Sequence, residues 1–569
     1  MKKSADYVRK YFPIAVWLPK YQHNLFRADL ISGVTVWGVV VPGAMAYAEL
    51  AGLPPQAGLY AAFAGMLAYA LFASSRHLKV TASSTMAIMS AAIVGDLSIV
   101  AGSEYAALSA MLAFTVGGII LLAGIAKLGF ISDFLSKPVT TGFLFGVSLE
   151  IIVSQAPKLF GLPRGSGNIF EQINQLLLGF SKANPWTVGV GIASLLLIAI
   201  IKRYARRIPG ALVALFVGIL TSTLFKLDQR GVSVVGSIPT GLPSPGIPAV
   251  RLSDLALLIA SAAGIVFLAV GESVSTARIF AAKHHYEIDA NQELIALGAA
   301  NLSAGLFQGF TVDASLSSTA TGEAAGVQTQ LSSIISAMLI IVTVAVLAPF
   351  FTALPNAVLG AIIIYSVLGL LDFRALKRFY REYRIDFGLA LVALVGVILT
   401  DVLSGLLIAV FLSIIMVVYS VSRPHLTELG EIPSHPGDYS SIVRNLANQR
   451  VPGILIMRLD EPLFFANANA TRTQILNLAK ESGSQPKAIL FDMSASNNID
   501  ITSIDMLWSL INDLDAEKIT VLLCHVLGPV RDKLRISGLM DRIGDKHIYS
   551  SVDTGVKDFL RSGSTKQNP

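Results

Sequence analysis

The chain of 569 residues is 53% apolar and only 14% charged, and its mean hydropathy is +0.65. An ordinary soluble domain is about 25% charged, so this composition excludes a soluble enzyme, a disordered protein and a nucleic-acid binder. The charge is also uneven, since about 22% of residues 422–569 are charged against about 11% of the residues before them. We therefore expect a large membrane part followed by a small soluble domain.

The net charge of +6 comes from the membrane part, which has 27 basic and 20 acidic residues, whereas residues 422–569 have 16 and 17. Basic residues in loops that set membrane topology explain this excess without a nucleic-acid partner. The single cysteine, Cys524, excludes internal disulfides and a cysteine-based metal site. Residues 1–29 form a polar N-terminal segment with no signal-peptide pattern, and we expect this segment in the cytoplasm.

Fourteen stretches could cross a bilayer, which takes about 20 apolar residues per helix. They lie near residues 30–49, 56–74, 84–100, 106–126, 139–157, 186–204, 209–226, 254–282, 291–308, 314–326, 331–353, 355–371, 384–401 and 403–421. With a cytoplasmic N-terminus, the cytoplasmic loops hold fifteen Lys and Arg residues and the opposite loops hold six. This asymmetry predicts that both termini are cytoplasmic.

The fourteen spans divide into two sets of seven, and an odd-numbered repeat inverts its neighbour's orientation. The spans at 84–100 and 314–326 are short and rich in Ser, Thr, Ala and Gly, and they hold the third position of each half. Weak spans at matching positions are the best sequence indication of a transporter's substrate site.

Residues 438–562 are predicted to form a small α/β domain after a linker at 422–437, and residues 563–569 form a tail. Short apolar runs alternate with helical patterns, which is typical of this class. The expected strands are Ile454–Leu459, Lys487–Met493 and Ile519–His525, and the expected helices are Asn469–Glu481, Thr502–Leu514 and Pro529–Leu539.

Hydroxyl side chains gather where the two short spans begin. In an inverted repeat these helix starts face each other near the midplane, and each offers a positive dipole end and free N–H groups to an anion. Ser and Thr could instead serve as packing and capping residues. The candidate substrate ligands are Ser83, Ser84, Thr85, Ser315, Ser317 and Ser318.

Glu272 lies within the span at 254–282, where a carboxylate is costly and indicates a function. With Ser275 it could bind H⁺ or Na⁺ and couple this ion to anion uptake; alternatively, it is a structural carboxylate. The first span is expected to break at Val41-Pro42-Gly43, which would place Tyr47 in a pocket wall.

Asp500, Thr502 and Ser503 lie between a predicted strand and a predicted helix. They could form a regulatory loop that is phosphorylated or senses an anion, or they could simply cap the helix. No catalytic triad, metal-ligand spacing or phosphate-binding glycine loop is present in the sequence. We therefore expect no enzymatic activity, no metal and no cofactor apart from a coupling ion.

Several motifs together resemble the SulP (sulfate permease) family over nearly the whole chain. They are Pro42-Gly43-Ala44-Met45-Ala46-Tyr47-Ala48, Ala51-Gly52-Leu53-Pro54-Pro55-Gln56-Ala57-Gly58-Leu59-Tyr60, Ser75-Arg76-His77 and the stretch from Asp289 to Gly298. The C-terminal domain resembles a STAS domain. The resemblance implies a core of spans 1–4 and 8–11, a gate of spans 5–7 and 12–14, and an elevator-type shift of the core. It also implies a homodimer, an anion site between the starts of spans 3 and 10, and a match of Glu272 to the family's span-8 carboxylate.

Three departures from the family pattern matter. Many members have Arg where this chain has Ser318, so the site lacks a fixed positive charge that would favour divalent sulfate. Many have Gly-Pro where this chain has Thr81-Ala82 or Ala82-Ser83. In STAS relatives that are phosphorylated, the hydroxyl residue directly follows the Asp, whereas Ile501 follows Asp500 here.

The sequence thus predicts secondary active transport of a small inorganic anion, sulfate first, coupled to H⁺ or Na⁺ in the inner (plasma) membrane. Bicarbonate or a dicarboxylate such as fumarate is the alternative cargo. An uncoupled anion channel and a membrane-anchored regulator acting through its STAS domain are the alternative classes.

Overall fold

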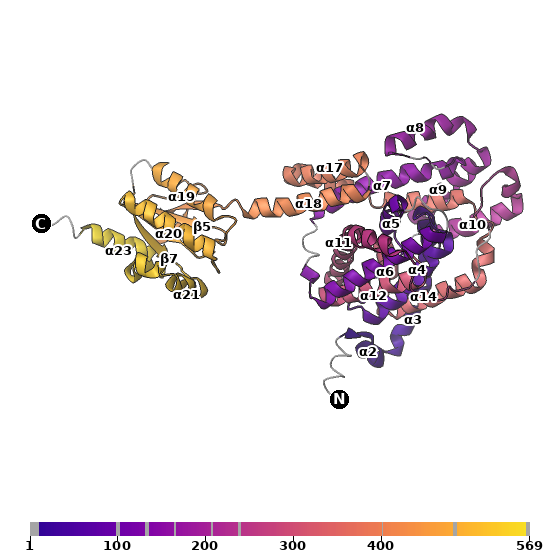
Figure 1. Cartoon of the computed structure of the whole chain (residues 1–569), viewed down its shortest axis with the longest axis horizontal. Helices are drawn as coiled ribbons and strands as arrows, with labels where there is room; N and C mark the ends of the chain where they lie inside the picture. Colours follow the sequence, from indigo (N-terminus) through magenta and orange to yellow (C-terminus); the bar gives the residue numbers. More distant parts are fainter. Residues whose placement is uncertain are drawn as a thin grey trace. The chain divides into compact units, whose positions relative to one another are not determined.

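The computed structural model describes residues 11–97, 103–130, 136–163, 165, 167–205, 209–236, 241–400, 402–481 and 486–564. Parts of the predicted N-terminal segment, of the spans at 84–100 and 384–401 and of the C-terminal tail lie outside these residues. The chain divides into two compact units, Met1–Ser413 and Ile414–Pro569, each considered by itself (Figure 1).

The first unit is helical, and each of the fourteen predicted spans coincides with a helix. Seven of the described helices are long and apolar enough to cross a membrane, judged by length and composition. Two helices connect spans and were not predicted: α8 (Ile169–Gly179) and α16 (Phe373–Glu382). The helices that match spans are α3 (Phe26–Leu50), α4 (Pro55–Phe72), α5 (Ser84–Leu97), α6 (Ser103–Ile125), α7 (Lys137–Phe160), α9 (Pro185–Tyr204), α10 (Gly210–Phe225), α11 (Leu252–Lys283), α12 (Ala290–Leu306), α13 (Leu316–Ala324), α14 (Leu331–Val342), α15 (Asn356–Leu368), α17 (Arg384–Leu399) and α18 (Val402–Val421).

The predicted break in the first span is wrong, because α3 runs through Pro42 as one helix of 25 residues. Proline removes a single backbone donor, at the carbonyl of Gly38. Helices of membrane proteins tolerate such a loss where neighbouring elements pack around them. Tyr47 therefore lies on a continuous helix and not on a broken one.

Glycines bring α6 and α12 into backbone contact. A Cβ atom on Gly117 would lie 2.4 Å from the amide nitrogen of Leu302, and one on Gly298 would lie 2.6 Å from that of Leu121. Gly124 and Gly305 repeat this close approach seven residues further along their helices. The seam holds α12 in place, and α12 leads directly into the candidate site.

The second unit contains a six-stranded sheet in the order β4-β3-β5-β6-β7-β8. Strands β5 (Ile454–Leu459), β6 (Ala488–Asp492), β7 (Thr520–Cys524) and β8 (Ile548–Tyr549) are parallel, and β3 is antiparallel to both β4 and β5. The first three of these parallel strands and helices α19 (Ala468–Glu481), α20 (Ile501–Ala516) and α21 (Gly528–Ile536) match the prediction. The helical membrane part and the small α/β domain are thus confirmed as the fold class.

The predicted linker at 422–437 is wrong, because it contains β3 (Leu426–Ile432) and the start of β4 (His435–Ser441). Leu429 pairs with Ile456 of β5, and its side chain is buried. One apolar cluster joins the sheet to α19, α20, α21 and α22 (Leu539–Ile543). A second cluster joins it to α23 (Val552–Ser564).

Candidate functional site

Two short strands join the starts of the short helices α5 and α13. Strand β1 (Val80–Thr81) pairs antiparallel with β2 (Asp313–Ala314), with Thr81 opposite Asp313. The N–H of Ser315 also donates to the carbonyl of Lys79 at 2.9 Å. The predicted meeting of these two helix starts is therefore confirmed, and the third and tenth spans are brought together by backbone pairing.

One serine caps each helix. The Ser83 hydroxyl accepts the N–H of Met86 at 3.2 Å, and the Ser315 hydroxyl accepts the N–H of Ser318, also at 3.2 Å. The Ser315 hydroxyl further donates to the Ser318 hydroxyl at 2.9 Å. Capping is therefore one role of Ser83 and Ser315, as the alternative interpretation expected.

The other candidate ligands differ in exposure. Ser84, Thr85 and Ser318 are buried, whereas Ser317 is exposed on α13. Tyr47 is half-buried and interacts with Asp313 and with Ser366 of α15. Contact between any of these side chains and an anion stays a prediction.

Glu272 of α11 faces Asp313 of β2, and the two carboxyl groups interact directly. Next to Glu272, the Ser273 hydroxyl accepts the N–H of Ala314 at 3.1 Å, which fixes α11 against β2. The predicted partner Ser275 is exposed instead. Asp313 and Ser273 were missed as site residues, although Ser273 directly follows Glu272 and Asp313 directly precedes the span at 314–326.

Several polar atoms at this junction are buried and unsatisfied. Among the described residues, Glu272 Oε2, both carboxylate oxygens of Asp313 and the Thr81 hydroxyl have no hydrogen-bonding partner of good geometry. Buried polar atoms nearly always have partners in folded proteins. This cluster can therefore accommodate protons, a cation or a polar ligand.

The side chain of Asn301 on α12 holds the strand that carries Asp313. Its Oδ1 accepts the N–H of Val312 at 2.9 Å, and its Nδ2 donates to the Val312 carbonyl at 2.8 Å. The Thr311 hydroxyl donates to the carbonyl of Met86 on α5 at 3.3 Å. The site is therefore attached to two helices by specific bonds.

The location of the Lys79 side chain differs from the one that the count of loop charges implies. The loop count places Lys79 in a cytoplasmic loop, but its side chain is fully buried in the helical unit. Its ammonium group donates to the hydroxyls of Ser332 and Ser333, and no carboxylate of the described residues lies within ion-pair distance. Its N–H donates to the Thr319 hydroxyl at 3.0 Å, beside Ser318 on α13. The Lys79 backbone thus lies beside the start of α13, while its side chain passes Gly322 and ends at α14.

In the second unit, Asp500 caps α20. Its carboxylate accepts the N–H of Ser503 at 2.8 Å and that of Phe465 at 2.6 Å. Partial burial acts to raise the pKa of Asp500, but these bonds and the charge of Lys533 outweigh it and hold the pKa below its usual value. Thr502 is exposed and Ser503 is buried. This geometry favours capping over the regulatory interpretation.

Asp492, Cys524 and His525 gather at the ends of β6 and β7, with potential ligand atoms within 4.8 Å of one another. Burial, together with the nearby Asp492 carboxylate, raises the pKa of the Cys524 thiol. The Nδ1 of His525 lies 2.9 Å from an oxygen of Asp492, and the N–H of Ser494 donates to the same oxygen. A thiol kept protonated and a carboxylate oxygen already bonded twice are poor metal ligands.

Comparisons with known proteins cover almost the whole chain. Residues 26–393 match the Sulfate permease family, and residues 445–555 match the STAS domain. A protein of Mycobacterium tuberculosis named "Probable sulfate transporter" is 36% identical over 96% of this chain and 98% of its own length. Sulfate transporter 3.1 of Arabidopsis thaliana is 32% identical over 96% of this chain and 87% of its own.

Solved structures show the same fold. The murine Slc26a9 anion transporter in the inward-facing state matches with a TM-score of 0.89 at 24% identity, over 98% of this chain and 95% of its own. The transmembrane domain of the cyanobacterial bicarbonate transporter BicA matches with a TM-score of 0.62 at 22% identity, over 68% of this chain and 98% of its own.

Proposed function

The chain belongs to the sulfate permease family, and we propose that it carries a small inorganic anion, sulfate first, by secondary active transport. It is a multi-pass membrane protein of a transporter family and not an enzyme. The relatives named as sulfate transporters, which match nearly end to end, support sulfate as the cargo.

The observation that carries the proposal is the pairing of β1 with β2, which brings the starts of α5 and α13 together. Two helix starts adjoin this place, and each contributes about half a positive charge from its dipole. Serine hydroxyls and backbone N–H groups add hydrogen-bond donors without a permanent charge at the ligand. An anion held in this way is bound firmly enough to be recognised and loosely enough to be released.

Coupling follows from the pair Glu272 and Asp313. Two adjacent buried carboxylates that were both ionised would repel each other and any anion nearby. Binding of H⁺ or Na⁺ to the pair removes this repulsion, so the anion and the cation are expected to bind together. Because binding of the anion and binding of the cation favour each other, the two ions would cross the membrane together, and the protein would be a symporter.

The proposed elevator movement requires contacts between core and gate that can break. Lys158 of α7 forms an ion pair with Glu49 of α3, and Tyr47 of α3 interacts with Ser366 of α15. Both contacts join a helix assigned to the core with one assigned to the gate. In the proposed mechanism they hold one end state and are released when the core moves.

The buried Lys79 supports a divalent cargo. Its ammonium group lies beside the last turn of α13, against Ser332 and Ser333 of α14, and acts through a medium of low dielectric constant. It therefore offsets part of the charge lost with Ser318. Bicarbonate and fumarate remain the cargoes to compare with sulfate.

The inner (plasma) membrane, cytoplasmic termini and a homodimer complete the proposal. The loop charges support the orientation. Labelling of cysteines introduced near residues 20 and 560 in intact cells would test it, and cross-linking in native membranes would test the dimer.

The decisive experiment measures uptake of labelled sulfate, bicarbonate and fumarate by proteoliposomes, with pH and Na⁺ varied separately. We expect saturable sulfate uptake that rises with H⁺ or with Na⁺, and Glu272→Gln and Asp313→Asn should each abolish this dependence. Asp228→Asn, at an exposed carboxylate, is the matched control.

Full pH and Na⁺ dependence in Glu272→Gln would disprove its coupling role. A steady current without saturation would indicate a channel. Failure to move any of the three anions would favour a regulator that acts through the STAS domain.

A further inference from the structure

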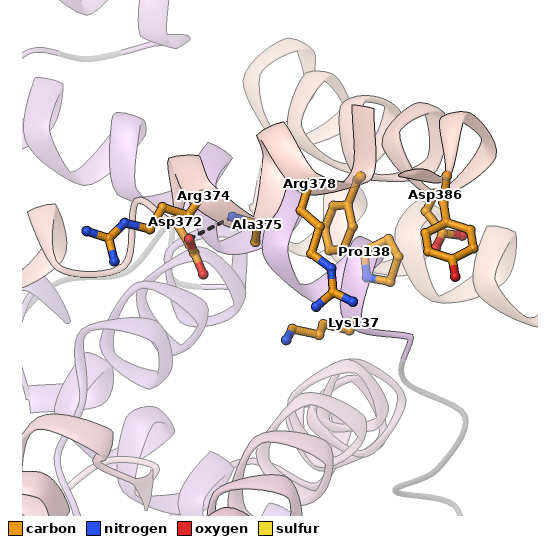
Figure 2. Close-up of a pocket in the computed structure, with 9 residues that line it drawn as sticks. Lys137, Pro138, Asp372, Arg374, Ala375, Arg378 and Asp386 are labelled. Carbon is orange, nitrogen blue, oxygen red and sulfur yellow. Dashed lines mark hydrogen bonds between the residues drawn. The ribbon is translucent and has the colours of Figure 1, made fainter. Parts of the chain in front are cut away.

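A cavity of about 430 Å³ lies where α7 begins and where α16 meets α17. Among its lining residues are three cations, Lys137, Arg374 and Arg378, together with Tyr383 (Figure 2). Its volume falls within the range of small-ligand pockets. None of its residues belongs to the β1–β2 site.

Helix α16 has the pattern of a helix that lies in a membrane interface. Its basic residues recur at three- and four-residue spacing and share one face: Arg374, Lys377, Arg378 and Arg381. Ala375 and Phe379 are buried on the opposite side against Ala390 of α17. Phe373 and Tyr380 are 65% and 61% exposed, as aromatic side chains at a membrane surface are.

Cations outnumber carboxylates in the lining of the cavity. Figure 2 shows Lys137 and Arg378 directed into the same space. The backbone carbonyl of Lys137 accepts the Thr141 hydroxyl, but its ammonium group has no hydrogen bond or ion pair among the described residues. Arg378 bonds Glu382 through Nε at 2.8 Å, which leaves its two terminal nitrogens for a ligand.

The two carboxylates of the lining do not cancel this charge. Asp372 accepts the N–H of Ala375 at 2.9 Å and caps α16. Residues 372–386 contain five basic and three acidic side chains, and Lys137 adds a further cation from α7. The cavity therefore suits an anion with several oxygen acceptors, for which arginine and lysine are the usual ligands.

We propose that this cavity binds the phosphate group of an anionic phospholipid. The lipid is favoured over free phosphate because exposed aromatic side chains flank the cations on a helix that connects two apolar helices, α15 and α17. The connections that contain Lys137 and α16 belong to the loops predicted to be cytoplasmic from their basic residues. The cavity would then lie at the cytoplasmic leaflet, where anionic lipids concentrate.

The bound lipid would steady the gate helices. A Cβ atom on Gly142 of α7 would lie only 1.9 Å from the carbonyl oxygen of Ala390, so the α7 and α17 backbones touch just beside the cavity. A headgroup bridging Lys137 of α7 and Arg378 of α16 therefore joins α7 to the helix that leads into its packing partner α17. Under the proposed elevator mechanism, this fixes the gate to the bilayer surface while the core moves.

The test uses the purified full-length protein and native mass spectrometry, with phosphatidylglycerol or phosphatidylcholine added in detergent. We expect phosphatidylglycerol adducts in the native chain and about 10- to 30-fold weaker binding in Lys137→Gln/Arg378→Gln, since each cation near an anionic surface contributes a several-fold factor. Lys480→Gln/Lys546→Gln removes two exposed cations of the STAS domain and should leave the adducts unchanged.

The conservative variant Lys137→Arg/Arg378→Lys keeps both charges and should retain binding, which distinguishes loss of the ligand site from loss of the fold. Inorganic phosphate is added as a separate arm. Equal phosphatidylglycerol binding in the double glutamine variant and the control would overturn the proposal. If millimolar phosphate displaced the lipid and raised the melting temperature of the protein as much as the lipid does, the cavity would be a free-phosphate site. This result would also overturn the proposal.

Discussion

The glycine seam between α6 and α12 allows a sharp test of how the core is held together. Replacing Gly117 with Ala would place a methyl group 2.4 Å from the amide nitrogen of Leu302, where ordinary contacts begin at 3.4 Å. Because the obstacle is backbone, no side chain can rotate away. The two helices must separate locally by about 1 Å.

Overpacking of this kind costs about 1–3 kcal/mol. The change from Gly to Ala also improves helix propensity by up to about 1 kcal/mol. We therefore expect Gly117→Ala to lower the free energy of unfolding by about 1–2 kcal/mol. Because Leu302 adjoins Asn301, which holds β2, transport should fall as well.

Gly118 is the matched control, because it is the next residue of the same helix and a Cβ atom there would have no neighbour within 4 Å. Gly118→Ala gains the same helix propensity without the clash and should be as stable as the native chain or slightly more stable. The assay is unfolding of the full-length protein in detergent, combined with sulfate uptake. Equal stability of the two variants would refute the packing argument.

Two further predictions follow from single side chains. Lys79→Met should reduce uptake of divalent sulfate more than uptake of monovalent bicarbonate, and an equal reduction of both initial rates would contradict a charge effect. Asp500→Ala should destabilise α20 by about 1 kcal/mol at neutral pH through loss of its cap, measured by hydrogen exchange in the full-length chain. Since the folded pKa of Asp500 is depressed, this contribution is present above the unfolded pKa of about 4 and is lost as the pH falls through the folded value. The difference between variant and native chain should therefore shrink below about pH 4, and a constant difference would argue against an ionised cap.

Much of the fold is predictable because the bilayer imposes its constraints locally. A run of apolar residues determines a span without knowledge of the rest of the chain. The matching positions of the two polar spans were also enough to predict that the starts of α5 and α13 would meet, although not that short strands would join them. The roles of Asp313 and Lys79 were not predictable, since each is a single charge in a short connection between spans and looks like a loop residue in the sequence.

The missed strand β3 has a similar cause. Pro424, Pro433 and Pro436 make the stretch resemble a linker. Pro424 and Pro433 lie outside β3, and Pro436 lies in β4 at the edge of the sheet, where a proline removes no essential hydrogen bond. Whether such a segment forms a strand depends on its pairing with strands that are distant in the sequence. The composition of the segment alone does not indicate this pairing.

The position of Cys524 has a practical consequence. It is the only cysteine of the chain, it is fully buried, and its raised pKa keeps it in the unreactive thiol form. The native protein is therefore expected to react very slowly with thiol reagents while it stays folded. A cysteine placed at Ser317 would report its own accessibility from each side of the membrane, and the native residue would not have to be removed first.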